Sequence, residues 1–183
     1  MASNLITTKE LYNVRVMGGK NASKRIGKVR AFVYHPKERR CIGIMVKRPD
    51  LLWMFHRKDL FVSLDGFEFE DGRVVLADDA KTRDKAACKA IDVRLDDCVI
   101  WGGMPVVTES GTTLGTVGVV TFSLATGKVD SFLVDTGATA NALLGTRSVP
   151  GELILGFRRG IGCALAGEYE GSDETPVLGA ILV

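Results

Sequence analysis

The residues with the clearest catalytic potential are Asp135, Thr136 and Gly137, which follow the apolar run FLV. An apolar strand that carries an aspartate to a tight turn is typical of a site at which paired aspartates hydrolyse peptide bonds. Such a site needs two carboxylates that share one proton, so that one acts as the base and the other as the acid. Because the chain contains a single Asp-Thr-Gly, a second copy of the chain would have to supply the other carboxylate.

The cysteines and histidines do not have the spacing of a metal site. No two cysteines form a Cys-x-x-Cys pair, and His35 and His56 lie far apart in the sequence. Zinc ligands are grouped more closely than this, so each cysteine is interpreted as a reduced, small apolar residue. The four are Cys41, Cys88, Cys98 and Cys163. No phosphate-loop pattern occurs either, and we predict no metal, no cofactor and no small-molecule ligand.

The composition is that of a folded globular protein. Apolar residues make up 46% of the chain and charged residues 25%, which excludes a disordered protein. The N-terminal residues lack the apolar core of a signal peptide, and no uncharged apolar run of about 18 residues occurs. These features predict a cytoplasmic protein without a membrane span. The apolar run TPVLGAILV at the last positions predicts that the natural chain continues.

Basic residues concentrate in the first third of the chain. Residues 1–60 contain 14 Lys and Arg against four Asp and Glu, whereas the formal net charge of the whole chain is only +2. This asymmetry indicates either a solvated surface or a docking face for an acidic partner, protein or RNA. The few aromatic residues nearby weaken the case for base stacking. The candidate face comprises Lys24, Arg25, Lys28, Arg30, Arg39, Arg40, Lys47 and Arg48.

The chain contains an internal repeat. The segment IGKVRAFVYHPKERRCIGIMVKRPD, which starts at Ile26, aligns without a gap with LGTVGVVTFSLATGKVDSFLVDTGA, which starts at Leu114. Each copy has the pattern of a strand that opens with apolar-Gly-x-Val, a tight turn and a paired strand. Strands at this spacing with Gly-rich turns predict an all-β fold in which each copy is a small barrel or a sandwich. The alignment matches Asp135 with Lys47, at the outgoing end of a hairpin strand.

The repeat sets the predicted domain boundaries. Residues 1–80 form the first domain, residues 81–97 a charged linker with helical character, and residues 98–183 the second domain. An apolar segment follows the first hairpin and is either part of the core or a contact with the other barrel or another protein. Its residues are Leu51, Leu52, Trp53 and Phe55.

The residues IGKVRAFVYHPKERRCIGIMVK and VSLDGFEFEDGRVVL resemble the PRC-barrel family, named for the cytoplasmic domain of the photosynthetic reaction centre H subunit. The family also includes the C-terminal domain of a ribosome maturation factor and short bacterial and archaeal proteins of unknown function. The resemblance covers roughly residues 5–80 and 95–165 as two tandem copies. It implies small, strongly bent β-barrels that dock on proteins or ribonucleoprotein surfaces, and it carries over no catalytic residue.

Three function hypotheses arise from these patterns. The first is a non-enzymatic scaffold or adaptor that binds proteins and self-associates through exposed strand edges. The second is an RNA- or ribosome-associated factor that uses the basic first barrel. The third is a retroviral-type aspartic protease that uses Asp135. Against the third, residues 136–183 are too few for the rest of a protease half-barrel, and residues 1–98 resemble the second half of the chain.

Overall fold

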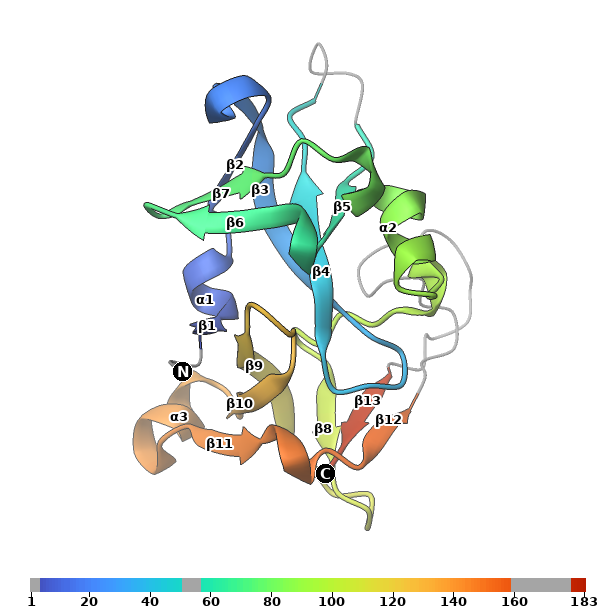
Figure 1. The fold of residues 1–183 in the computed structure, drawn as a ribbon. Coiled ribbons are helices and arrows are strands. Elements are labelled where there is room, and N and C mark those ends of the chain that lie inside the picture. The colour runs from blue at the N-terminus through green and yellow to red at the C-terminus, as the bar shows by residue number, and fades with distance from the viewer. Residues whose placement is uncertain (1–3, 51–56, 159–178) are drawn as a thin grey trace.

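A computed structural model describes residues 4–50, 57–158 and 179–183 of the chain. The protein is built mainly from strands, which form two sheets accompanied by a few short helices (Figure 1). The predicted all-β class is confirmed. The apolar segment of Leu51, Leu52, Trp53 and Phe55 lies outside the described residues.

The N-terminal half contributes a six-stranded sheet with the strand order β5-β4-β3-β2-β7-β6. Neighbouring strands within this sheet are antiparallel, except for β2 and β7, which run parallel to each other. The long hairpin of β3 and β4 forms its centre, as the alternation of apolar and polar residues predicts. The strands are β2 (Arg15–Gly18), β3 (Lys24–Tyr34), β4 (Cys41–Lys47), β5 (Leu60–Ser63), β6 (Phe67–Glu70) and β7 (Arg73–Leu76).

The second sheet has the strand order β11-β10-β9-β8-β13-β12, and β1 also pairs with β9. Without β1, this order matches that of the first sheet strand for strand, including a parallel pair, here β8 and β13. The strands are β1 (Leu5–Thr7), β8 (Pro105–Val107), β9 (Thr113–Ser123), β10 (Val129–Asp135), β11 (Arg147–Pro150), β12 (Gly156–Arg158) and β13 (Ala180–Leu182).

The register of the two long hairpins follows the alignment of the sequence segments. Val29 faces Val46 in the first hairpin, and the aligned residues Val117 and Val134 face each other in the second. The next shared pairs are Phe32 with Ile44, and Val120 with Phe132. In both hairpins the longer strand therefore carries one extra residue between these pairs, which is a β-bulge at the same aligned position.

Among the described residues, three short α-helices accompany the sheets. Helix α1 (Thr8–Leu11) begins with a capping box, in which the Thr7 side chain and the Glu10 side chain each satisfy the other's backbone N–H. Helix α2 (Asp84–Ala90) lies in the predicted linker, and helix α3 (Ala138–Leu144) follows β10. Figure 1 shows α2 beside β5, and it is fixed there because the Phe61 N–H donates to the Asp84 carboxylate at 3.1 Å.

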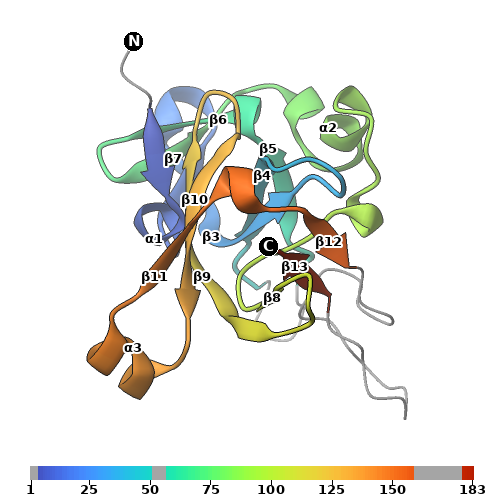
Figure 2. The same cartoon turned by 90° about the horizontal axis from the view of Figure 1, so that it is seen from below.

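The two sheets share one hydrophobic core. The Phe32 ring of β3 meets the Phe122 ring of β9 edge-on, with centroids 6.2 Å apart. Figure 2 shows β3 and β4 of the first sheet beside β9 and β10 of the second. The turn of the first hairpin also bonds to the second, because the Cys41 N–H donates to the Gly127 carbonyl at 2.8 Å. These contacts, together with the pairing of β1 to β9, join the two halves of the chain.

The boundaries at residues 80 and 97 stay a prediction. Strand β1 belongs to the predicted first domain but is hydrogen-bonded into the second sheet. Among the described residues, no helix has the length and apolar character needed to cross a membrane.

Candidate functional site

Asp135 lies at the end of β10 and organises the turn into α3. Its Oδ1 atom accepts hydrogen bonds from the Gly137 N–H at 2.8 Å and from the Asn141 side-chain amide at 2.7 Å. The Asn141 side-chain oxygen in turn accepts from the Thr136 N–H and hydroxyl. The Asp-Thr-Gly letters thus form a hydrogen-bonded turn, which is the local chemistry that Asp and Asn favour at such positions.

The electrostatics of Asp135 are opposite to those of a protease dyad. Its side chain is exposed, and the hydrogen bonds from Gly137 and Asn141 lower the pKa of the carboxyl group. A proton shared between two aspartates requires that one of them have a raised pKa. This carboxylate is therefore built to stay ionised, and its hydrogen bonds give it a structural role.

A row of cations crosses the N-terminal sheet where β2, β3 and β4 run side by side. Lys28 of β3 lies directly opposite Arg15 on one side and Lys47 on the other. Arg15 and Lys47 are exposed and Lys28 is half-buried. Directly opposed residues share a face of the sheet, so these three charges, which we call the basic row, form a stripe across three strands. The sequence did not identify Arg15, because its place depends on the pairing of β2 with β3.

A hollow of about 370 Å³ lies beside the basic row. Arg48 on its wall is held in place by hydrogen bonds to the Lys58 carbonyl. Lys24 is exposed at the start of the same strand β3 that carries Lys28. The hollow therefore gathers more than half of the predicted basic residues, since those that line it are Arg25, Lys28, Arg30, Lys47 and Arg48.

Arg39 and Arg40 lie elsewhere, at the hairpin turn between β3 and β4. The Arg39 guanidinium donates to the Glu152 carbonyl at 3.1 Å, and Arg40 forms an ion pair with Glu38 at 2.6 Å. An isolated bridge also pairs Arg40 with Lys128 of the second hairpin. The length of β3 separates this turn from the basic row, so the predicted residues divide into two groups. These two arginines help to join the sheets.

Arg30 lies on the border between the basic hollow and a larger cavity. Its guanidinium forms an ion pair with Asp59 at 2.8 Å. The cavity has a volume of about 830 Å³ and is lined by segments of β3, β9, α1 and the chain before β8. Arg30 and Tyr12 line both spaces.

Tyr34 contributes an unusual polar group to the wall of the larger cavity. Its side chain is 1% exposed, and its ring stacks on Trp101 with centroids 4.1 Å apart. The Tyr34 hydroxyl is buried and has no hydrogen-bond partner among the described residues. A buried hydroxyl without a partner costs roughly 1–3 kcal/mol. No sequence pattern singles out Tyr34, because this environment arises only when the two sheets pack together.

The described cysteines are buried thiols, as the sequence predicts. Cys41, Cys88 and Cys98 are free, and Cys163 lies outside the described residues. Burial raises the pKa of Cys41 to about 12. Among the described residues, no cluster of three His, Cys, Asp or Glu side chains has the arrangement needed to hold a metal ion.

Cys41 is expected to resist alkylation in the folded protein and to make the fold sensitive to alkali. A free thiol has a pKa of about 8.5, and burial raises that of Cys41. Its contribution to stability is therefore complete below about pH 8.5 and is lost as the pH rises toward the folded pKa. Iodoacetamide labelling at pH 8, read by peptide mass spectrometry, should modify Cys41 in urea and not in buffer. Equal labelling in both would contradict its burial.

Comparison with known proteins supports the fold assignment for the second half of the chain. Residues 101–158 match the model of the PRC-barrel domain family, so this part of the chain is similar to that domain, which is generally a non-catalytic module. A search of curated proteins found no match for the chain. The interpretation of the N-terminal half as a further copy of this domain stays a prediction.

Proposed function

We propose that the protein is a non-enzymatic adaptor that binds an acidic segment of a partner protein along the basic row. The proposal rests chiefly on the direct opposition of Arg15, Lys28 and Lys47 across three neighbouring strands. Like charges that face each other across strands destabilise a sheet. A negatively charged partner relieves this repulsion, so the energy stored in the row becomes available for binding.

Comparison with the second hairpin indicates that the charges of the basic row have a role other than solubility. The residues of the second hairpin that align with Lys28 and Lys47 are Thr116 and Asp135, which also face each other. The same position in a similar hairpin is therefore occupied without any cation. A stable hairpin of this shape does not need the basic row, which favours a binding role for it.

The basic hollow extends the proposed binding surface. Arg25 and Arg48 add two positive charges beside Lys28 and Lys47, and Asp50 is the only acidic residue among the described residues of the lining. Arg48 is held by a backbone carbonyl, so its guanidinium loses little freedom when a carboxylate binds. Preorganised cations of this kind suit the carboxylates of an acidic peptide.

RNA is the alternative partner, and one observation favours it. Tyr12 borders the basic hollow and its side chain is 61% exposed, so one base has an aromatic ring on which to stack. We favour the acidic protein because Tyr12 is the only aromatic residue among the described residues that line the hollow, and single-stranded RNA is normally bound by several such rings.

Two model polyanions distinguish these partners. We expect poly-L-glutamate to bind the protein at low salt and poly(U) to bind more weakly. The double variant Lys28→Glu and Lys47→Glu should weaken poly-L-glutamate binding by at least about tenfold, since it turns two attractions into repulsions. Fluorescence anisotropy with labelled polymers measures both affinities, and circular dichroism verifies that the variant is folded.

The matched control reverses two exposed charges outside the row, Lys81→Glu and Lys85→Glu. Its affinity for poly-L-glutamate should change by no more than about threefold, the effect of net charge alone. If both double variants lose binding equally, the row is not the site. Preference for poly(U), lost in the row variant, would establish the RNA alternative instead.

A further inference from the structure

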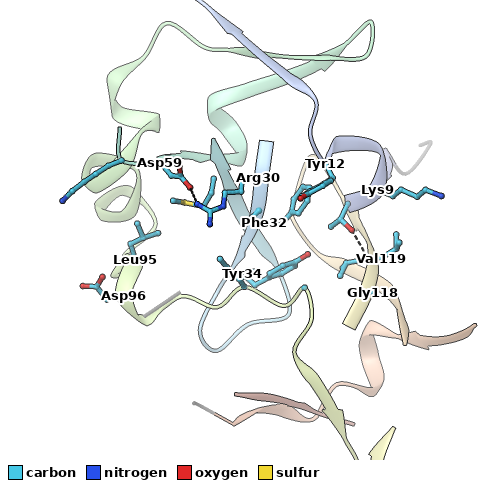
Figure 3. A pocket seen from close by; sticks show the side chains of 17 residues that line it. Lys9, Tyr12, Arg30, Phe32, Tyr34, Asp59, Leu95, Asp96, Gly118 and Val119 are labelled. Carbon is cyan, nitrogen blue, oxygen red and sulfur yellow. Dashed lines mark hydrogen bonds and ion pairs between the residues drawn. The ribbon is translucent and has the colours of Figure 1, made fainter. Parts of the chain in front are cut away.

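The larger cavity lies between strands that occupy aligned positions in the two halves of the chain. Ala31 and Phe32 of β3 line one side, and the aligned residues Val119 and Val120 of β9 line the other. Figure 3 shows the close-up, with Phe32 and Tyr34 toward the middle and Gly118 and Val119 on the β9 side. The cavity therefore exists only because the two sheets pack against each other.

The walls of the cavity suit a planar apolar ligand. Met45, Leu95 and Ile100 add aliphatic surface to the two strands, and Tyr12, whose side chain is exposed, also lines the cavity. The volume of about 830 Å³ falls within the range of about 300–1,000 Å³ typical of small-molecule sites. A single anchoring side chain of a peptide would leave most of this space unfilled.

The Tyr34 hydroxyl is, among the described residues, an unpaired polar group buried in the wall of the cavity. Figure 3 shows the Tyr34 ring with its hydroxyl directed toward the Gly118 and Val119 side, away from Arg30. Burial raises the pKa of Tyr34, so the hydroxyl keeps its proton and serves as a hydrogen-bond donor. Because no described residue accepts that bond, a ligand atom with a lone pair satisfies a group that the fold leaves unpaired.

The charges around the opening favour an anion. Lys9 and Lys58 are exposed cations of the lining, and the charge of Arg30 is balanced by its ion pair with Asp59. In the described part of the chain, Asp96 is the only other acidic residue that lines the cavity. The opening also adjoins the basic hollow, with which it shares Tyr12 and Arg30. The local potential is therefore positive.

We propose that this cavity binds an aromatic organic anion. Its ring system lies between Ala31 of β3 and Val119 of β9, which are half-buried lining residues, an acceptor atom takes the hydrogen bond of the Tyr34 hydroxyl, and its negative charge faces the cations at the opening. This inference goes beyond the adaptor role, because an acidic segment on the basic row and a small molecule in the cavity occupy different surfaces.

A pair of fluorescent probes tests the proposal. The dye 1-anilinonaphthalene-8-sulfonate is an aromatic anion, and N-phenyl-1-naphthylamine is its neutral analogue. We expect the sulfonate to bind with one-to-one stoichiometry and a dissociation constant at least about fivefold lower than that of the amine, since one screened charge contact contributes about 1 kcal/mol. Absence of saturable sulfonate binding would overturn the proposal, and so would equal affinity for the two probes.

Two variants locate the probe. Val119→Trp fills the cavity and should abolish sulfonate binding, whereas Tyr34→Phe removes one hydroxyl and should weaken binding about threefold to tenfold. In the protein without ligand, Tyr34→Phe should raise the Tm by about 2–4 °C, because an unpaired buried hydroxyl is lost. A variant at a distant exposed cation, Arg73→Gln, should bind the probe like the wild type.

The remaining outcomes are equally decisive. If Val119→Trp keeps a native near-ultraviolet circular dichroism spectrum and still binds the sulfonate, the probe lies elsewhere and the proposal fails. If Val119→Trp does not fold, the Tyr34→Phe variant alone tests the proposal. Unchanged affinity for the sulfonate in a folded Tyr34→Phe protein would refute the proposal. Binding of poly-L-glutamate by the Tyr34→Phe variant shows separately whether the adaptor surface is intact.

Discussion

Phe122→Ala is expected to lower the free energy of unfolding by about 3–5 kcal/mol and to destabilise both sheets together. Phe122 is fully buried in β9 and its ring meets Phe32 of the other sheet. Removing the ring leaves a cavity in the part of the core that both sheets share. The loss should therefore appear as one cooperative transition at a lower urea concentration, followed by far-ultraviolet circular dichroism.

The neighbouring substitution Thr121→Ala is the control for this prediction. Thr121 is half-buried in the same strand, and its truncation should cost no more than about 1 kcal/mol. Amide signals from β4 and β10, followed by nuclear magnetic resonance through the urea titration, report on the two sheets separately. Loss of the β10 signals at a urea concentration where those of β4 persist would show that the sheets unfold independently.

Gly27→Ala is the second substitution with a large expected effect. It should lower the free energy of unfolding by about 3 kcal/mol. A Cβ atom at Gly27 would overlap the carbonyl oxygen of Lys47 on the neighbouring strand. Because the obstacle is backbone, no side-chain rotation relieves the clash, and β3 and β4 must move apart. The aligned residue Gly115 has the same restriction, since its Cβ would collide with the Asp135 carbonyl.

Gly102→Ala is the matched substitution in open space. No atom lies within 4 Å of a Cβ built at Gly102, so the same added methyl group should change the stability by less than about 0.5 kcal/mol. Thermal unfolding of the two variants measures the difference. Similar melting temperatures would mean that the close approach of β3 and β4 at Gly27 is not a constraint on the fold.

Gly27→Ala also connects stability to the proposed function. The clash is with Lys47, and Gly27 itself lines the basic hollow. Separation of β3 from β4 would therefore displace Lys47 from Lys28 within the basic row. We expect the variant to lose part of its affinity for poly-L-glutamate even at temperatures where it remains folded.

The role of Asp135 depends on the residues around it in the structure. An Asp-Thr-Gly sequence supports catalysis only when its aspartate shares a proton with a second carboxylate. The alignment with Lys47 places Asp135 at the end of a hairpin strand. The hydrogen bonds from Gly137 and Asn141 account for the residue as part of a turn, and the match of residues 101–158 to a non-catalytic domain agrees with that role.

The sequence by itself determined the mainly β class and the two long hairpins. It also determined the concentration of positive charge in the first third of the chain. These features depend on the alternation of side chains along a strand and on short turns, which involve residues close together in the chain. The aligned bulges and the aligned glycines Gly27 and Gly115 lie within the same hairpins.

Only the tertiary structure decided which residues meet. Arg15 joins Lys28 and Lys47 because β2 pairs with β3, and the turn with Arg39 and Arg40 lies at the far end of the hairpin. Strand β1 crosses to the second sheet, and the cavity with the Tyr34 hydroxyl forms where the two sheets pack. Such contacts join residues far apart in the sequence, and their geometry depends on the shapes of whole sheets, which no local pattern of residues encodes.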